Sequence, residues 1–341
     1  MKSRDKKAYA LAGVNIKAAD EAIDLIKRHV RSASRPEVLT DIGLFGGLFE
    51  FKGYSEPVLV SSIDGVGTKI KIASLLDKHD TVGIDLVNHC VNDILACGAN
   101  PLFFLDYIGM GKLVPERVET VVGGIADACR SAGCALIGGE MAEMPGVYQP
   151  DDYDLVGCII GAVEKSNILK GDSISPKDAV LGLSSSGLHT NGYSLVRRVF
   201  GIDEDPSSLQ VFYPELERTL GEELLEPHRC YRSELNPALP KIKGLAHITG
   251  GGLVGNLPRI LPQGLAAHLD KSTWHIPPIF RLIQEQGGVE EAEMYQVFNM
   301  GIGMAIICSP EQVAELAAVL PEATVIGEVV ETRGKQRISI T

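Results

Sequence analysis

The sequence lacks the features that mark zinc-binding, membrane-spanning and exported proteins. Its seven cysteines include no CxxC pair and no cysteine–histidine grouping with zinc-like spacing. The longest apolar runs, such as Met304–Cys308, fall far short of the roughly 20 residues of a membrane span. Met1–Ala10 is basic, but no apolar segment follows it, so no signal peptide is expected. An odd number of cysteines in mostly apolar surroundings fits a reducing compartment, and we expect a cytoplasmic protein without a membrane partner.

Positive charge is also scarce. The chain has 32 Lys and Arg against 44 Asp and Glu, which gives a formal net charge of −12. Binding to nucleic acid or an anionic membrane requires a basic face, so we expect neither partner. A phosphorylated small molecule is not excluded, because a metal ion and backbone amides can hold one locally.

The chain is long enough for two domains of mixed α/β structure. It has 341 residues, of which 45% are hydrophobic. Apolar residues spaced by three and four predict helices at Lys17–Arg31 and Ile84–Cys97. Short apolar runs predict strands, including these: Leu102–Ile108, Cys134–Ile137, Ala179–Leu183, Gly264–Leu269, Met304–Cys308 and Thr324–Val330. The polar segment Lys165–Asp178 is the best boundary, which predicts domains at residues 1–168 and 169–341.

One stretch, Leu59–Lys69 (LVSSIDGVGTK), combines a buried strand with a polar, glycine-containing end. Asp64 is followed by Gly65, Gly67, Thr68 and Lys69. Glycines allow close approach of a ligand and expose backbone N–H groups to an anion. The stretch therefore suits a metal–phosphate site, although a glycine turn with an incidental aspartate fits equally well.

Two further acids resemble Asp64 in their placement. Asp93 lies on the polar face of a predicted helix, and Glu140 follows two glycines after a short strand. Mg²⁺ prefers a few carboxylates together with phosphate and water oxygens, so convergence of the three acids would make a Mg²⁺–ATP site. A single acid at such a position is more often a cap or turn residue.

The familiar nucleotide motifs are absent or weak. No GxxxxGK[ST] sequence occurs, which argues against a P-loop. Gly250, Gly252 and Gly255 match the GxGxxG pattern of dinucleotide-binding loops, which is normally followed by a helix. Pro258 and Pro262 limit the length of any helix here. Phosphate binding by a glycine run is therefore favoured over a dinucleotide site.

Two histidines lie in polar loops. His189 stands among serine, threonine and asparagine residues, and His247 precedes the triple glycine. Both suit proton transfer or phosphate contact near neutral pH, although a strand-end histidine such as His247 is often satisfied by backbone. No G-x-S-x-G surrounds a serine, which argues against a triad hydrolase.

Ordered motifs along nearly the whole chain resemble the phosphoribosylformylglycinamidine cyclo-ligase family. They are SSIDGVGTK, VNDILACGANPLFFLDY, LIGGEMAEMPGVY, SSSGLHTNGYS, AHITGGGLVGNLPRILP, PPIFRLI and EEAEMYQVFNMGIGM. The resemblance implies a homodimer of two-domain α/β subunits that dimerises through the N-terminal domain. It also implies ATP-dependent ring closure of formylglycinamidine ribonucleotide in purine biosynthesis, with Mg²⁺; a need for K⁺ stays open.

The resemblance also implies roles for individual residues. It places Asp64, Asp93 and Glu140 at the metal, with Asp64 also in catalysis. It assigns nucleotide contacts to Lys27, Gly65, Gly67, Thr68, Lys69 and Asp93. Without the resemblance, the position of Lys27 on its predicted helix indicates only a surface lysine. His189 and Asn191 would act in catalysis, with His189 handling the proton. Substrate contacts fall to Thr190, His247, Thr249, Gly250, Gly251 and Gly252.

Several positions depart from the usual family pattern. Leu11 and Asn15 stand where aspartates are usual, Met141 replaces the threonine of GGET, and His228 stands where threonine is common. None removes a first-choice metal acid. Two alternatives remain: another phosphotransferase of the superfamily, such as selenophosphate synthetase or thiamine monophosphate kinase, or a catalytically silent nucleotide-binding module.

Overall fold

A computed structural model describes residues 12–41, 43–332 and 334–341. The chain forms two compact units. The first consists of the described parts of Met1–Gly53 together with Ser61–Cys90 and Pro101–Ile160, and the second of Tyr54–Val60, Val91–Asn100 and Gly161–Thr341. The predicted boundary between residues 168 and 169 stays a prediction.

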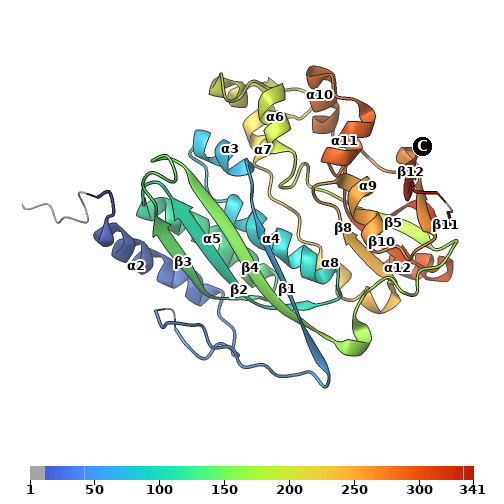
Figure 1. The fold of residues 1–341 in the computed structure, drawn as a ribbon, viewed down its shortest axis with the longest axis horizontal. Coiled ribbons are helices and arrows are strands. Elements are labelled where there is room, and N and C mark those ends of the chain that lie inside the picture. The colour runs from blue at the N-terminus through green and yellow to red at the C-terminus, as the bar shows by residue number, and fades with distance from the viewer. Residues whose placement is uncertain (1–11, 42, 333) are drawn as a thin grey trace, which may run out of the picture. The chain divides into compact units, whose positions relative to one another are not determined.

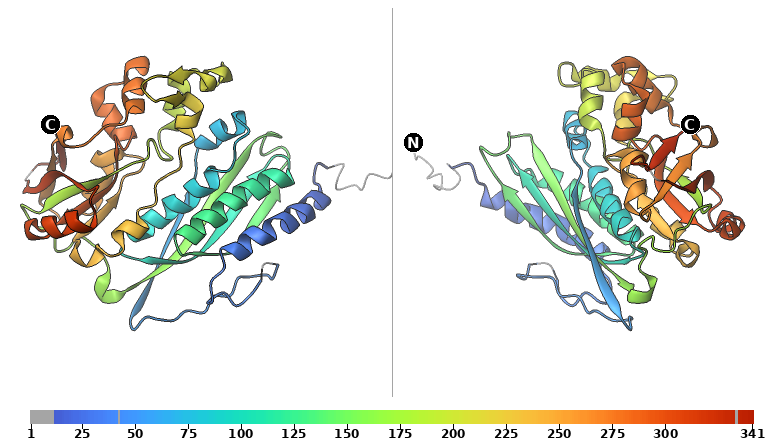
Figure 2. Two further views of the ribbon diagram at one scale, coloured as in Figure 1. Left: turned by 180° about the vertical axis from the view of Figure 1, so that it is seen from behind. Right: turned by 45° about the vertical axis from the view of Figure 1, so that its right-hand side comes forward.

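The first unit is built on a four-stranded sheet with helices on one face (Figures 1 and 2). The strand order is β1-β4-β2-β3. The strands are β1 (Pro57–Gly65), β2 (Asn100–Met110), β3 (Ala135–Glu143) and β4 (Tyr153–Glu164). The helices are α2 (Ile16–Ser32), α3 (Lys69–Leu75), α4 (Val82–Leu95) and α5 (Pro115–Ser131). The predicted helices at 17–31 and 84–97 are confirmed as α2 and α4.

One predicted strand end is wrong. The sequence places the end of a strand at Ile137, before two glycines, but β3 continues to Glu143. Pairing with β2 carries it through Gly139, which lies opposite Asp106. A Cβ atom at Gly139 would lie 2.5 Å from Oδ1 of Asp106, so glycine is needed here for close approach and does not break the strand.

The second unit contains a six-stranded sheet of order β12-β9-β11-β5-β10-β8. The strands are β5 (Ala179–Ser184), β8 (Gly244–His247), β9 (Leu265–Leu269), β10 (Ile302–Cys308), β11 (Thr324–Glu331) and β12 (Ile338–Ile340), with a small β6 (Phe212–Tyr213) and β7 (Arg218–Thr219) pair. The α-helices are α6 (Tyr193–Val199), α7 (Leu220–Leu224), α8 (Arg232–Leu235), α9 (Gly252–Asn256), α10 (Pro278–Gly287), α11 (Glu291–Val297) and α12 (Val313–Val319). Short 3-10 turns complete the unit: Lys165–Asn167, Pro206–Gln210, Leu239–Lys241, Leu257–Arg259, Lys271–Thr273 and Pro310–Gln312.

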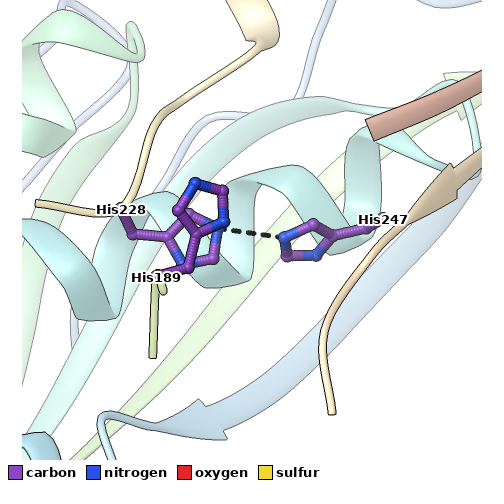
Figure 3. A group of neighbouring side chains, drawn as sticks. All are labelled: His189, His228 and His247. Carbon is purple, nitrogen blue, oxygen red and sulfur yellow. Dashed lines mark hydrogen bonds between the residues drawn. The ribbon is translucent and has the colours of Figure 1, made fainter. Parts of the chain in front are cut away.

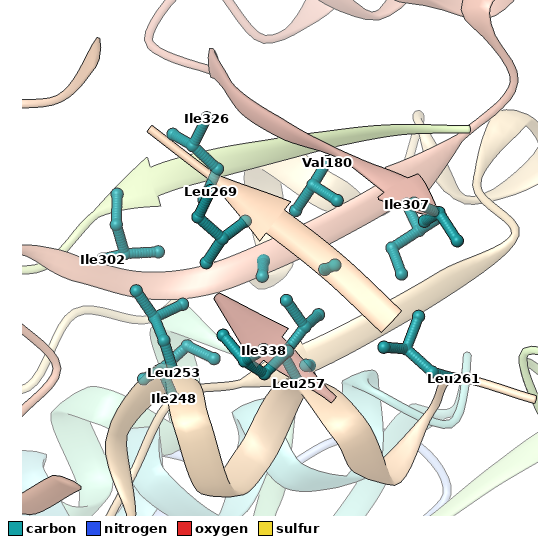
Figure 4. Packing of buried hydrophobic residues seen from close by; sticks show 14 of the residues in the cluster. Val180, Ile248, Leu253, Leu257, Leu261, Leu269, Ile302, Ile307, Ile326 and Ile338 are labelled. Carbon is teal, nitrogen blue, oxygen red and sulfur yellow. The ribbon is translucent and has the colours of Figure 1, made fainter. Parts of the chain in front are cut away.

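Apolar side chains cover both faces of this sheet. One cluster contains Leu253, Leu257, Ile302 and Ile307, as Figure 4 shows. The other contains Met304 and neighbours from the opposite face. The register of β10 against β5 shifts between Ile302 and Met304, so the alternation of side chains changes at this bulge. Because both faces of the sheet are covered, side chains on both sides of each strand are apolar, and the strand sequences are nearly continuous apolar runs.

No helix among the described residues is both long and apolar enough to cross a membrane.

Candidate active site

In the first unit, Asp64 lies near the end of β1 with its carboxylate 39% exposed. One carboxylate oxygen lies 2.8 Å from Nε2 of His89, and the other accepts the N–H of Gly65 at 2.7 Å. Val66 is fully buried and anchors the loop, while Gly67 adopts a positive φ of 66° and is exposed. The loop thus presents a carboxylate and backbone to solvent, an arrangement that a metal–phosphate site would use. The contact with His89 was not foreseen.

Lys69 does not lie in the exposed part of this loop. Its side chain is fully buried, and its ammonium group is 2.8 Å from the carboxylate of Asp85, which is also fully buried. A lysine held in this way cannot reach a phosphate at the surface unless the ion pair opens. The structure therefore argues against Lys69 as a direct phosphate ligand and gives it an anchoring role at the start of α3.

The three predicted metal acids do not form one site within the first unit. Asp64 lies on edge strand β1, whereas Glu140 lies on the opposite edge strand, β3, where it is exposed. Three strand spacings of about 4.8 Å separate the two edges, or roughly 14 Å. Asp64 and Glu140 of one chain therefore cannot ligate the same ion, which corrects the expectation of convergence. Asp93 belongs to the second unit.

The remaining first-unit residues have ordinary structural settings. Lys27 is exposed on α2 and pairs with Asp24 at 2.7 Å, as expected of a surface lysine. Asn15 caps α2, its side chain accepting the N–H of Ala18. Met141 continues β3 opposite Ile108. Leu11 lies outside the described residues.

In the second unit, His189 occupies a tightly held loop between β5 and α6. Its side chain is 1% exposed, and its φ of 60° is unusual for a residue other than glycine. The N–H of Ser186 donates to Nε2 of His189 at 3.1 Å, and the hydroxyl of Tyr193 donates to its carbonyl oxygen at 3.1 Å. Such backbone strain persists only where neighbouring contacts fix it, and it is common at functional sites.

A bulge in β10 makes room for this histidine. Gly303 lies at the bulge, and a Cβ atom there would be 2.6 Å from Cε1 of His189 and 2.0 Å from the hydroxyl oxygen of Tyr231. Asn299, just before β10, supports the same loop. Its amide donates to the carbonyl of Gly187 at 2.9 Å, and its carbonyl oxygen accepts the Ser185 hydroxyl at 3.0 Å. Asn299 lies within the FNMGIGM motif, but its residue type alone did not indicate this supporting role.

Asn191 faces the glycine loop that precedes α9. A Cβ atom at Gly250 would lie 3.1 Å from Oδ1 of Asn191. The Nδ2 atom of Asn191 is buried and has no hydrogen-bond partner in the described part of the chain. Buried amide groups are normally satisfied, so this donor is suited to a bound ligand.

The glycine loop is held by Asn256, whose role local sequence patterns do not indicate. Its Nδ2 lies 3.3 Å from the carbonyl oxygen of Thr249, 3.2 Å from that of Gly250 and 2.9 Å from that of Gly252. Gly251 and Gly252 both have positive φ, 101° and 59°. The loop is therefore preorganised, and its conformation requires glycine at these positions.

His247 ends β8 and contacts an acid that the sequence assigns to metal binding. Its Nδ1 lies 2.8 Å from Oδ1 of Asp93, and its Nε2 lies 3.0 Å from Nε2 of His228. His228 is fully buried, and its Nδ1 lies 3.5 Å from the hydroxyl of Thr190. Asp93 thus orients an imidazole here, a role that its position on a polar helix face did not reveal.

Asn92, next to Asp93, fastens the end of α4 to the chain around His228. Its amide donates to the carbonyl of Arg229 at 2.8 Å, and its carbonyl oxygen accepts the N–H of Tyr231 at 3.0 Å. Asn92, on the polar face of α4, therefore joins distant segments of the second unit.

Two family descriptions match the chain. Residues 49–163 match "AIR synthase related protein, N-terminal domain", and residues 175–339 match the corresponding C-terminal domain. The chain is 53% identical over 336 residues to phosphoribosylformylglycinamidine cyclo-ligase of Geobacillus kaustophilus, covering 96% of this chain and 97% of that protein. This chain belongs to the phosphoribosylformylglycinamidine cyclo-ligase family. A cyclo-ligase relative from Caldicellulosiruptor bescii is 52% identical over 95% of this chain and 96% of its own length.

Solved structures of more distant proteins share the cyclo-ligase fold. Thiamine-monophosphate kinase from Stenotrophomonas maltophilia matches with a TM-score of 0.68 at 16% identity, over 94% of this chain and 95% of that chain. The hydrogenase maturation protein HypE in complex with ATP matches with a TM-score of 0.67 at 17% identity, over 95% and 90% of the two chains. At these identities the likeness concerns the fold alone.

Proposed function

We propose that this chain closes the imidazole ring of 5-aminoimidazole ribonucleotide in purine biosynthesis. The substrate is formylglycinamidine ribonucleotide, ATP is consumed, and ADP and phosphate are released. The observation that carries the proposal is 53% identity, over 96% of the chain, to the phosphoribosylformylglycinamidine cyclo-ligase of Geobacillus kaustophilus. The preorganised loops of the second unit, around His189 and Gly250–Gly252, provide surroundings that suit a phosphorylated substrate.

The reaction has two chemical steps. In the first, the formyl oxygen of the substrate attacks the γ-phosphorus of ATP, the bond to ADP breaks, and loss of the formamide N–H proton gives an iminophosphate. In the second, the ribose-bearing nitrogen attacks the formyl carbon, the carbon–oxygen bond breaks, and phosphate leaves as the ring loses a proton. Phosphorylation is needed because an amide oxygen is otherwise a poor leaving group.

His189 is the group proposed to handle the proton. It is buried, and the Ser186 N–H fixes one ring nitrogen, so the imidazole has a defined orientation. Asn191 offers a buried amide donor beside the glycine loop. We assign Asn191 to the reacting amide, and Thr190, Thr249 and Gly250–Gly252 to the substrate phosphate, which backbone N–H groups hold well. His247 is buried, and its proposed role is to hold these substrate-binding residues in place.

ATP and Mg²⁺ are assigned to the loop after β1. When bound, Mg²⁺ neutralises charge that develops on the transferred phosphoryl group. The exposed carboxylate of Asp64 supplies the oxygen ligand that Mg²⁺ prefers, and Gly67 and Thr68 supply backbone N–H groups for the phosphates. Gly65, whose N–H donates to Asp64, contributes by having no side chain that would keep a phosphate away. Lys69 acts by anchoring this loop through Asp85. Lys27 remains a further proposed nucleotide contact.

Asp93 and Glu140 remain proposed metal acids with separate roles. Asp93 holds His247, so its binding of Mg²⁺ requires that it share its carboxylate with that imidazole. Glu140 would take part in a second ion site, or would meet Asp64 of another subunit, since the two residues of one chain lie on opposite edges of the sheet.

A homodimer is proposed on the open face of the four-stranded sheet. Helices cover one face, whereas on β1 the outward side chains Leu59 and Ile63 are 63% and 68% exposed. Large apolar side chains exposed on a strand commonly mark an interface. Analytical ultracentrifugation of the wild type and Ile63→Asp tests this: the wild type should sediment as a dimer and the variant should dissociate, whereas a monomeric wild type would refute it.

A substrate panel tests the enzymatic proposal. The purified protein is incubated with Mg²⁺–ATP, with and without K⁺, and with formylglycinamidine ribonucleotide, selenide or thiamine monophosphate in turn. We expect ADP release only with the formylamidine, with a diazotisable aminoimidazole as the second product. ADP release only with selenide or thiamine monophosphate would assign the chain to another activity of the superfamily, and ATP binding without any turnover would indicate a silent nucleotide-binding module.

A further inference from the structure

Three histidines from separate segments meet in the interior of the second unit (Figure 3). His189 comes from the loop after β5, His228 from the segment between α7 and α8, and His247 from the end of β8. Their exposures are 1%, 0% and 6%. One ring nitrogen from each lies within 4.8 Å of the other two.

The rings face one another closely. The rings of His189 and His228 are stacked, with centroids 3.9 Å apart and an angle of 21° between their planes. Nε2 of His228 and Nε2 of His247 are 3.0 Å apart and share one hydrogen bond. The proton of that bond occupies the position between two nitrogen lone pairs, where a metal ion can replace it.

We propose that His189, His228 and His247 form a binding site for a zinc-class transition metal ion. Imidazole nitrogen is a good ligand for Zn²⁺, Co²⁺, Ni²⁺ and Cu²⁺, and three histidines leave a fourth position open on a tetrahedral ion. Mg²⁺ prefers oxygen ligands, so the ion that accompanies ATP does not compete for this site.

The surroundings of the cluster resemble those of established histidine metal sites. Metal-bound imidazoles usually donate their second N–H to a carboxylate or carbonyl group, which fixes the ring and strengthens the ligand. Here Oδ1 of Asp93 lies 2.8 Å from Nδ1 of His247. At His189 the N–H of Ser186 donates to Nε2, so metal binding requires either that Nε2 release this hydrogen bond or that Nδ1 lose its proton. Gly303 leaves the space that the ring needs.

His228 completes the cluster of three imidazoles. Threonine is common at this position in the family that the sequence resembles, and with threonine only two imidazoles would remain. A bound ion would also hold His189, the residue proposed to handle the proton, so we expect it to inhibit turnover; this consequence rests on the proposed function, whereas binding does not.

Cobalt provides a direct test with the full chain. Co²⁺ is titrated into the wild type, into H228T and into H268Q, which removes an exposed histidine on β9 outside the cluster. We expect one Co²⁺ per subunit, visible bands of a tetrahedral ion, and displacement by Zn²⁺ but not by excess Mg²⁺. H268Q should behave as the wild type, and H228T should bind more than about 100-fold more weakly, because even loss of an outer partner costs 10- to 100-fold.

Two results would overturn the proposal: no tetrahedral Co²⁺ spectrum in the wild type, or equal binding by H228T. A second readout is turnover at increasing Zn²⁺, each protein being compared with its own zinc-free rate. The wild type and H268Q should lose activity at concentrations that leave H228T unaffected. Absence of any zinc-free turnover would count against the proposed function, while the Co²⁺ spectrum would still decide the metal site.

Discussion

The ammonium group of Lys69 lies 2.8 Å from the carboxylate of Asp85, and both side chains are fully buried. Removing one member of such a pair leaves an uncompensated charge in the interior, at a cost of about 3–5 kcal/mol. Lys69→Met should therefore lower the free energy of unfolding by about this amount, measured by chemical denaturation. The double variant Lys69→Met, Asp85→Leu should recover much of the loss.

If Lys69 instead served mainly as a phosphate ligand, Lys69→Met would fold with nearly wild-type stability and show only a raised KM for ATP. That pattern would contradict the anchoring role.

The glycine loop before α9 offers a matched pair of substitutions. A Cβ atom at Gly252 would lie 2.1 Å from the carbonyl oxygen of Tyr295, and the residue has a φ of 59°. At Gly255, three residues on, nothing lies within 4 Å of the added atom. Gly252→Ala should lower the melting temperature, costing more than about 2 kcal/mol, and raise KM for the ribonucleotide.

Gly255→Ala should keep KM and be neutral or stabilising by up to about 1 kcal/mol, because alanine favours a helix. If Gly252→Ala and Gly255→Ala had the same melting temperature and the same KM, the loop conformation would be unimportant for stability and for substrate binding.

Asp106 predicts an unusual dependence of stability on pH. Burial raises the pKa of Asp106 from 3.8 to about 7. Between these values the folded state keeps a proton that the unfolded state has released, so the free energy of unfolding falls as pH rises towards 7. The slope is at most about 1.4 kcal/mol per pH unit. Asp106→Asn should remove this contribution and gain stability relative to the wild type between pH 5 and pH 8.

Asp24→Asn, which removes an exposed carboxylate on α2, is the control and should run parallel to the wild type. The comparison is made by denaturant titration without Mg²⁺. A wild type and an Asp106→Asn variant that change in parallel with pH would contradict the assignment.

The two roles proposed for Asp93 can be separated by kinetics. Its carboxylate lies 2.8 Å from Nδ1 of His247, and it is also a proposed Mg²⁺ ligand. Asp93→Asn should lose most turnover in either role, roughly 10- to 100-fold for lost ligand or positioning contacts. A raised Mg²⁺ requirement in the variant supports the ligand role, whereas an unchanged requirement leaves only the orientation of His247. Near-normal turnover at low Mg²⁺ would refute both.

Much of the fold could be predicted from local patterns. The spacing of apolar residues located α2 and α4, and short apolar runs located β5, β9, β10 and β11 to within a few residues. The sequence did not predict β12 or α11, because Ile338–Ile340 is very short and Glu291–Val297 shows only a weak apolar pattern. Glycine usually interrupts a strand, but at Gly139 pairing with the neighbouring strand continues β3 through the glycine.

The site was less predictable than the fold. Residue types singled out His189, Asn191 and the glycine loop, yet the supporting residues Asn256 and Asn299 became apparent only from their contacts. Sequence order also gave no means of knowing that Asp64 and Glu140 lie on opposite edges of one sheet. Strand order depends on long-range pairing, which local patterns do not encode.

The ring-closing activity is tested most directly by the product stoichiometry with formylglycinamidine ribonucleotide and Mg²⁺–ATP. ADP, phosphate and the diazotisable aminoimidazole are quantified in the same reaction, for the wild type and for His189→Asn. We predict equal amounts of all three products from the wild type and a large loss of all three in the variant. ADP release without aminoimidazole, or no release of either by folded protein, would contradict the proposed ring-closing activity.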